Sequence, residues 1–441
     1  MLPFAPLSPI ILVMSVQSSE AIARGTSRRA GWARPWGALQ SGSPGAAVAS
    51  ESVASRDGLK LAFAVWLAVR IVLSLWGAFI MAVAPADSHA HILRDYPDVV
   101  LPNHDLYGYS VGVWNIYDTR HYITIAEQGY EADPAWLPAY FPAYPILIKL
   151  ATPLLLGDSL LAAMLIANVC ALIFFWYLYR LVEPEFGADV ARRAVILSAI
   201  FPASFYLFMG YTEAPLLAFM VASLYHARRH QWWLAGILAG AAALTKQPGI
   251  FLLLPLAFIY WQQQRGQGLW SYIKRPQWAW LLLCPLAALA YTLYRYLYIS
   301  APIADVADVG GSQRMTFPGL PLLYALQAIG PDNPLLPYNL MDIGFTLLMI
   351  ALVAGVTLKM RSTTLTLYAL VICLTNLCIY MWTYEYRPEV NMPRRMLIIF
   401  PVFIFLALVT PNKRVFRIVA YTSFALFLCL SGLWANWIFV S

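Results

Sequence analysis

Long, uninterrupted runs of apolar residues constrain this chain more than any other feature. Several of them reach the ~20 residues with which a helix crosses the hydrocarbon core of a bilayer. The chain is 61% hydrophobic and 12% charged, against roughly 25% charged in an average soluble domain. Because lipid offers no hydrogen bonds to backbone amides, such runs must satisfy their own backbone as helices. The sequence therefore predicts an all-α polytopic membrane protein.

Eleven runs are candidate spans: 60–83, 158–182, 190–209, 212–228, 231–246, 248–262, 277–298, 341–358, 363–382, 396–410 and 416–438. A further run, 140–156, is ambiguous. If it lies along the membrane interface, the loops that carry Arg192, Arg193, Lys359 and Lys413 all fall on the cytoplasmic side, as the positive-inside rule requires. We therefore predict about 11 transmembrane helices, with the first loop (84–157) and a second long loop (299–340) facing outward.

Outside the membrane part, the sequence changes character. Residues 1–58 are rich in Ser, Ala, Gly and Arg, which predicts a disordered cytoplasmic extension before a transmembrane domain at 59–441. The net charge of +7 does not indicate nucleic-acid binding, because the positive residues are scattered through short loops. No cysteine spacing suits zinc, and no His/Asp cluster suits a divalent ion. We expect no metal and no cofactor.

The predicted outward face carries an unusual polar stretch, "WNIYDTRHYITIAEQGY" at 114–130. On one continuous helix, Trp114, Asp118 and His121 would share a face. The stretch has two readings. It could be an interfacial helix with an aromatic belt and a paired carboxylate, or a helix that turns Asp118 toward a cavity. An ionised carboxylate at a membrane boundary costs free energy unless it has a partner. The second reading, in which Asp118 faces a cavity and has a function, therefore stays open.

Four motifs, in the same order, resemble those of the PIG-V-like mannosyltransferases of the GT-C glycosyltransferase superfamily. They are "YDTRHYITIAEQGY" with "YFPAYPILIKLA", then "FPASFYLFMGYTEAPLLAF", "ALTKQPGIFLLLP" and "MPRRMLIIFPVFIFLA". The resemblance implies a GT-C-like bundle with two interfacial helices in the first extracytoplasmic loop. These would be 114–130 and 140–156.

The resemblance also implies a reaction. An inverting glycosyltransferase of this kind moves a sugar, here mannose, from a polyprenyl-phosphate carrier to a hydroxyl of a glycan or lipid acceptor outside the cytoplasm. By match to the motifs, Asp118 is the expected catalytic base. The expected substrate-binding residues are His121, Tyr122, Glu213, Lys246, Arg394 and Arg395. One of the two arginines is the first choice for the phosphate, and Lys246 is the second.

Three departures and one alternative remain. The Trp that precedes the family's acidic residue is Tyr117 here, and the Arg of the third motif is Lys246, which keeps the charge but loses the bidentate fork. The Tyr that follows Pro-Arg in the family's fourth motif is Arg395 here. A transporter or flippase of a lipid-linked saccharide is the alternative function. Transporters usually show internal repeats and ionisable groups at mid-membrane, and this sequence shows neither.

Overall fold

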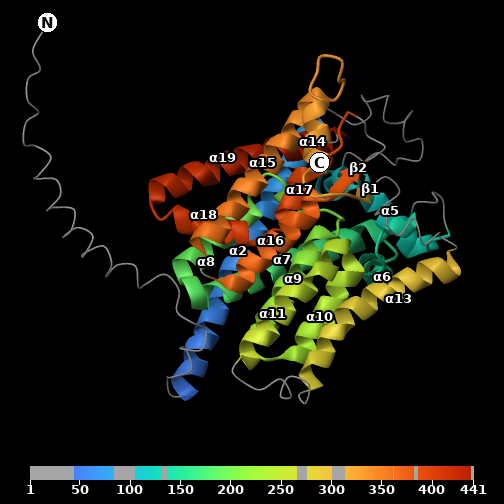
Figure 1. Ribbon diagram of the computed structural model, residues 1–441. Helices are drawn as coiled ribbons and strands as arrows, with labels where there is room; N and C mark the ends of the chain where they lie inside the picture. Colours follow the sequence, from blue (N-terminus) through green and yellow to red (C-terminus); the bar gives the residue numbers. More distant parts are fainter. Residues whose placement is uncertain are drawn as a thin grey trace, which may run out of the picture.

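The computed structural model describes residues 44–83, 105–131, 137–265, 276–299, 313–360, 362–381 and 386–438. These residues form a bundle of helices of very different lengths (Figure 1). Residues 1–43 of the predicted extension, and residues 84–104 of the first loop, lie outside the described residues.

In the described part of the chain, five helices are long and apolar enough to cross a membrane: α2 (Pro44–Val83, apolar from Arg56), α7 (Ser159–Phe186), η9 with α13 (Pro276–Leu282 and Leu283–Tyr298), α15 (Leu336–Lys359) and α19 (Lys413–Ala435). The other six predicted spans are shorter or broken helices, so the count of 11 is not confirmed. They are α8 (Ala188–Ala199), α9 (Glu213–Arg228), α10 (Trp232–Thr245), α11 (Leu253–Gln264), α16 (Thr363–Leu377) and α18 (Pro401–Val409).

Proline accounts for several of the breaks, because it has no amide hydrogen to donate within a helix. The predicted span 190–209 divides into α8 and the short 3₁₀ helix η7 (Ser204–Phe208), on either side of Pro202. The span 248–262 begins as the 3₁₀ helix η8 (Gln247–Leu252), which contains Pro248. These breaks leave turns where polar side chains can gather.

Two predictions about local structure need correction. The chain is not entirely helical, because β1 (Gln313–Met315) pairs antiparallel with β2 (Ile379–Met381) at the end of the run 363–382. The stretch 114–130 is not one helix either. Trp114 belongs to the separate η4 (Gly112–Trp114), and α5 (Asp118–Gln128) starts only after Tyr117, whose φ of 51° breaks the helical path. Trp114 and Asp118 therefore do not share a helical face.

α2 also begins earlier than the boundary at residue 58. The segment 44–58 is helical, which agrees with its Ala-rich sequence and with a proline at its first position. The second outward loop contains the helix α14 (Leu320–Gln327) before α15 begins.

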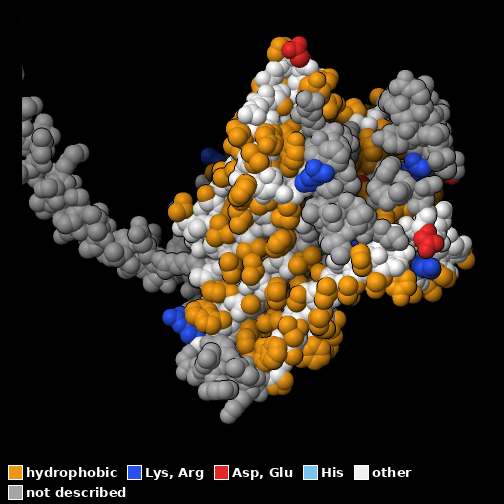
Figure 2. Space-filling view, turned by 45° about the vertical axis from the view of Figure 1, so that its right-hand side comes forward, with side chains coloured by type: hydrophobic (Ala, Val, Ile, Leu, Met, Phe, Trp, Pro, Cys, Tyr) orange, Lys and Arg blue, Asp and Glu red, His pale blue; other side chains and the backbone are white. Residues whose placement is uncertain are grey.

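The helices that position the polar residues pack around α7. α7 contacts α9, α8, α5 and α6 (Ala143–Ala151), and α9 contacts α10. In Figure 1, α5 and α6 lie at one side of the bundle, next to the end of α13. Hydrophobic side chains dominate the face seen in Figure 2, where few charged ones are visible. Such a surface is typical of a helix bundle solvated by lipid.

Candidate active site

The first residue of α5 is Asp118, and the turn before α9 fixes its position. Tyr211, just ahead of α9, accepts a hydrogen bond from the Asp118 backbone N–H at 3.2 Å. The same hydroxyl donates to the Ile116 carbonyl at 3.1 Å. One fully buried tyrosine thus ties the start of α5 to the start of α9. Tyr117, whose φ of 51° is positive, makes the sharp turn that leads into α5.

Arg394, on the six-residue helix α17 (Met392–Leu397), lies between two carboxylates. Its Nη1 donates to Oδ2 of Asp118 at 2.5 Å, and its Nε and Nη2 donate to the two oxygens of Glu213 at 2.6 and 3.2 Å. The guanidinium also lies over the ring of Tyr211, 4.5 Å from its centroid. Such paired, bidentate and stacked contacts are those for which arginine is suited.

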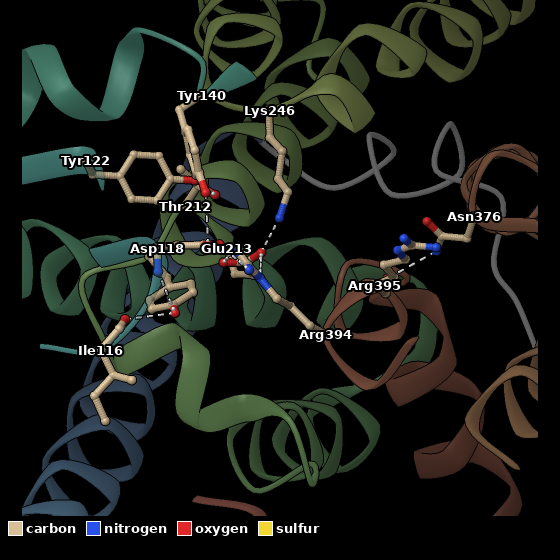
Figure 3. A network of polar contacts seen from close by, with 11 residues as sticks. Ile116, Asp118, Tyr122, Tyr140, Thr212, Glu213, Lys246, Asn376, Arg394 and Arg395 are labelled. Atoms are coloured by element: carbon tan, nitrogen blue, oxygen red, sulfur yellow. Dashed lines mark hydrogen bonds and ion pairs between the residues drawn. The ribbon is translucent and has the colours of Figure 1, made fainter. Parts of the chain in front are cut away.

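Lys246, at the end of α10, completes the group. Its Nζ donates to Oε1 of Glu213, the oxygen that also accepts from Nε of Arg394. The four charged residues Asp118, Arg394, Glu213 and Lys246 therefore alternate in sign, and we call them the charge network (Figure 3).

The two ends of the charge network are open and its centre is closed. The side chains of Asp118 and Lys246 are 24% and 29% exposed, whereas those of Arg394 and Glu213 are 8% and 0% exposed. Only the terminal carboxylate and the terminal ammonium are therefore accessible to a ligand from outside. The inner pair is a buried ion pair, which persists only when both partners stay in place.

The environment keeps the carboxylate of Asp118 ionised. Burial alone would raise its pKa, but the charge of Arg394, its hydrogen bond, and the nearby His121 and Lys246 together hold the pKa below its usual value. Burial would likewise lower the pKa of Arg394, but Glu213 and Asp118 raise it well above its usual range. Asp118 is therefore unprotonated near neutral pH, which is the state a base must have before it accepts a proton.

Three aromatic groups border Asp118. The Tyr140 hydroxyl donates to Oδ1 of Asp118 at 3.2 Å, and its ring packs 5.1 Å from the ring of His121. Burial, aided by the charge of Asp118, raises the pKa of Tyr140 well above its usual value, so Tyr140 stays a donor. Tyr122 is almost fully buried, packs against Tyr140, and shares a hydrogen bond with Thr212 at 3.1 Å. Its position is that of a packing residue behind the site.

Arg395 lies apart from the charge network, although it follows Arg394 directly (Figure 3). Its Nη1 donates to the Ile379 carbonyl at 3.3 Å, and its own carbonyl accepts from Asn376 at 3.2 Å. Burial lowers its pKa to about 10, against the opposing effect of Asp342 and Glu389. The two adjacent arginines therefore face different surroundings.

The structure thus brings Asp118, His121, Glu213, Lys246 and Arg394 together and leaves Arg395 outside. Sequence reasoning did not find the roles of Tyr140 and Tyr211. Tyr211 precedes Glu213 by two residues in "MGYTEAP", but nothing in that spacing indicates a bond to the start of α5. Within the described ranges, no group of three or more His, Cys, Asp or Glu side chains is placed to hold a metal ion.

The assembled groups suit proton transfer beside an anion. A partly exposed carboxylate can accept a proton from a hydroxyl, and a partly exposed ammonium can bind a developing negative charge. Both lie on one connected network, and both are reached from outside the bundle core. The geometry therefore has the two parts that a group transfer from a phosphate ester requires.

Comparison with known proteins agrees with the motifs. Residues 138–290 match the family described as dolichyl-phosphate-mannose-protein mannosyltransferase. The chain is 32% identical over 161 residues to GPI alpha-1,6-mannosyltransferase 2 of Mus musculus, and 29% identical over 164 residues to that of Rattus norvegicus. These matches cover 34% of this chain and 31–32% of the relatives, so the similarity spans about a third of their length.

Among solved structures, the chain is similar to the apo form of the Archaeoglobus fulgidus oligosaccharyltransferase. That likeness covers 85% of this chain and 55% of the other, with 14% identity and a TM-score of 0.38, which is too low to assign a shared fold. The five long apolar helices among the described residues are those of an integral membrane protein. The match of residues 138–290 to the dolichyl-phosphate-mannose-protein mannosyltransferase family and the similarity to GPI alpha-1,6-mannosyltransferase 2 confirm the predicted resemblance to the PIG-V-like mannosyltransferases.

Proposed function

We propose that this protein is an inverting mannosyltransferase, which moves mannose from a polyprenyl-phosphate carrier to an acceptor hydroxyl at the outer face of the membrane. The observation that carries the proposal is the charge network, with an ionised carboxylate at one open end and an ammonium at the other. The match of residues 138–290 to a mannosyltransferase family supports the sugar class. The carrier and the outward side rest on the motif resemblance and on the distribution of cationic loops.

Asp118 is the base in this proposal. As the acceptor oxygen attacks the anomeric carbon, the bond from that carbon to the phosphate oxygen breaks, and the hydroxyl proton passes to Asp118. The electron pair of the broken bond stays on the phosphate. Arg394 and Tyr140 hold the two carboxylate oxygens of Asp118. His121, close by on the same helix, is placed to orient the base or contact the sugar.

Lys246 is the preferred ligand for the departing phosphate. Arg394 and Arg395 were the first choice from the sequence, but Arg394 is engaged by two carboxylates and is almost fully buried. Arg395 is equally buried and lies outside the network. Lys246 has the most exposed cation of the network and a single carboxylate partner in it. We therefore assign the phosphate to Lys246 and a positioning role to Arg394.

The test compares membranes that carry wild-type protein, Asp118→Asn or Glu127→Gln, each incubated with polyprenyl-phosphate-[³H]mannose. Glu127 is an exposed carboxylate on the same helix, which makes it a matched control. We expect Asp118→Asn to lower label transfer to non-donor material by about 10²–10⁴-fold with donor binding retained. Glu127→Gln should transfer normally.

Unchanged transfer in Asp118→Asn would remove the base assignment. Donor movement across proteoliposome membranes without any sugar transfer would favour the flippase instead.

A further inference from the structure

The two accessible ends of the charge network are joined through a single buried carboxylate. Oε1 of Glu213 accepts from both Lys246 and Arg394, and Arg394 in turn donates to Asp118. Glu213 itself is fully buried, so no ligand from outside can replace it. Any change in the partner of Lys246 must therefore alter how strongly Glu213 holds Arg394.

We infer that Glu213 is a positioning residue that couples the two ends, so that a donor phosphate bound at Lys246 loosens the hold of Arg394 on Asp118 and releases that carboxylate as the base. This inference rests on the proposed function. It adds an order of events: the donor binds first, and the base becomes active as a consequence.

Competition for shared hydrogen-bond partners is the first argument. When a phosphate oxygen takes over Nζ of Lys246, Oε1 of Glu213 loses one of its two cationic partners. Glu213 then interacts more strongly with Arg394, which already donates to both of its oxygens. Because the surroundings are buried and weakly polarisable, such shifts among neighbouring charges are large compared with those in water.

Net charge is the second argument. Asp118 and Glu213 balance Arg394 and Lys246, so the charge network is neutral in the resting protein. A bound phosphodiester makes it negative, which raises the affinity of the remaining carboxylates for a proton. The accessible one is Asp118. The proton affinity of the base therefore rises when the donor is in place and the acceptor hydroxyl must lose its proton.

Asp118 keeps its place while its ion pair loosens. Its backbone N–H is bonded to Tyr211, and its Oδ1 accepts from Tyr140, so neither contact depends on Arg394. The titratable groups that face it from the packed elements are His121, Tyr122, Tyr140, Tyr211, Glu213, Lys246 and Arg394.

The test is Glu213→Gln, which removes the charge with little change in shape. Lys246 loses its carboxylate partner, so binding of polyprenyl-phosphate-mannose should tighten several-fold. Arg394 then pairs with Asp118 alone, so turnover should fall about tenfold or more. The pKa of Asp118 falls, and the acidic limb of the pH–turnover profile moves to lower pH. Glu213→Asp keeps the charge and should restore part of the turnover.

A purely structural role for Glu213 predicts another pattern, in which donor binding and turnover are lost together and the acidic limb does not move. That pattern would overturn the coupling. It would leave the proposed function intact as long as the wild type transfers mannose and Asp118→Asn does not. Absence of transfer in the wild type would instead refute the proposed function itself.

A second measurement needs no Glu213 variant. Calorimetric titration of the wild type with polyprenyl-phosphate-mannose, in two buffers of different ionisation enthalpy near pH 5, reports protons taken up on binding. The phosphodiester of the donor does not titrate there. We expect proton uptake in the wild type that disappears in Asp118→Asn. Equal proton uptake in both proteins, or none in either, would contradict the release of the base by the donor.

Discussion

At the scale of single residues, the position of Asp118 depends on a close approach that only glycine allows. A Cβ on Gly210 would lie 2.5 Å from Cγ2 and 3.2 Å from Oγ1 of Thr119, the residue that follows Asp118. Thr119 is fully buried, so it cannot move outward into solvent. Gly210 thus sets how near the turn before α9 comes to the start of α5.

We predict that Gly210→Ala displaces Thr119 and, with it, Asp118. The rate of mannose transfer should fall by at least about tenfold, because a small misplacement of a catalytic group lowers the rate by that factor or more. Thr119→Ala alone should be mild, because the Thr119 hydroxyl finds no hydrogen-bond partner among the described residues. The double variant should regain most of the activity. If the double variant is no better than Gly210→Ala, the contact with Thr119 is not the cause of the loss.

At the scale of elements, α17 is too short to be stable by itself and depends on α15 for its position. Asp342 of α15 pairs with Arg387 at 2.5 Å, and its other oxygen accepts from the backbone N–H of Met392, the first residue of α17. Both side chains of the Asp342–Arg387 pair are almost fully buried. This pair therefore positions the helix that carries Arg394.

We predict that Asp342→Asn destabilises the protein by about 3–5 kcal/mol, because it removes the buried carboxylate that compensates the charge of Arg387. Thermal unfolding in detergent measures the change. Asp189→Asn is the matched control. Its partner Arg192 lies at 2.9 Å, but the two side chains are 53% and 80% exposed, and such surface pairs contribute about 0–1 kcal/mol. Equal effects of the two variants would contradict a structural role for the buried pair.

At the scale of the whole molecule, the proposal requires the charge network to face away from the cytoplasm. Among the described residues, five helices have the length and hydropathy of a span, and neither property specifies a direction across the membrane. The cationic loops favour one orientation, in which the loop between α7 and α8 is cytoplasmic and the end of α5 is outside.

We predict that, in a variant without native cysteines, Glu131→Cys reacts with a membrane-impermeant thiol reagent in intact cells and Ala188→Cys reacts only after the cells are opened. Both positions are exposed in the structure, which makes the comparison one of sidedness alone. The reverse pattern would place the network on the cytoplasmic side and would contradict the outward assignment.

Much of the local structure was predictable from the sequence, because apolar runs and turn residues act over short distances. The long helices α7, α15 and α19 lie close to their predicted positions, and the first acidic motif does begin a helix. The breaks within shorter runs were harder to predict. Hydropathy averages over a window and does not register a proline that divides the run 190–209 or a strand that ends the run 363–382.

The sequence by itself determined the helical, lipid-facing class of the chain, the identity of the acidic residue at the start of α5 and the presence of cations near the later motifs. Only the tertiary structure decided which cation belongs to which carboxylate. Asp118 and Arg394 are separated by 276 positions, and Arg394 rather than Arg395 completes the network. The physical reason is that helical periodicity specifies which side chains share a face within one element. Contacts between α5, α9, α10 and α17 depend instead on how the elements pack, which no local pattern specifies.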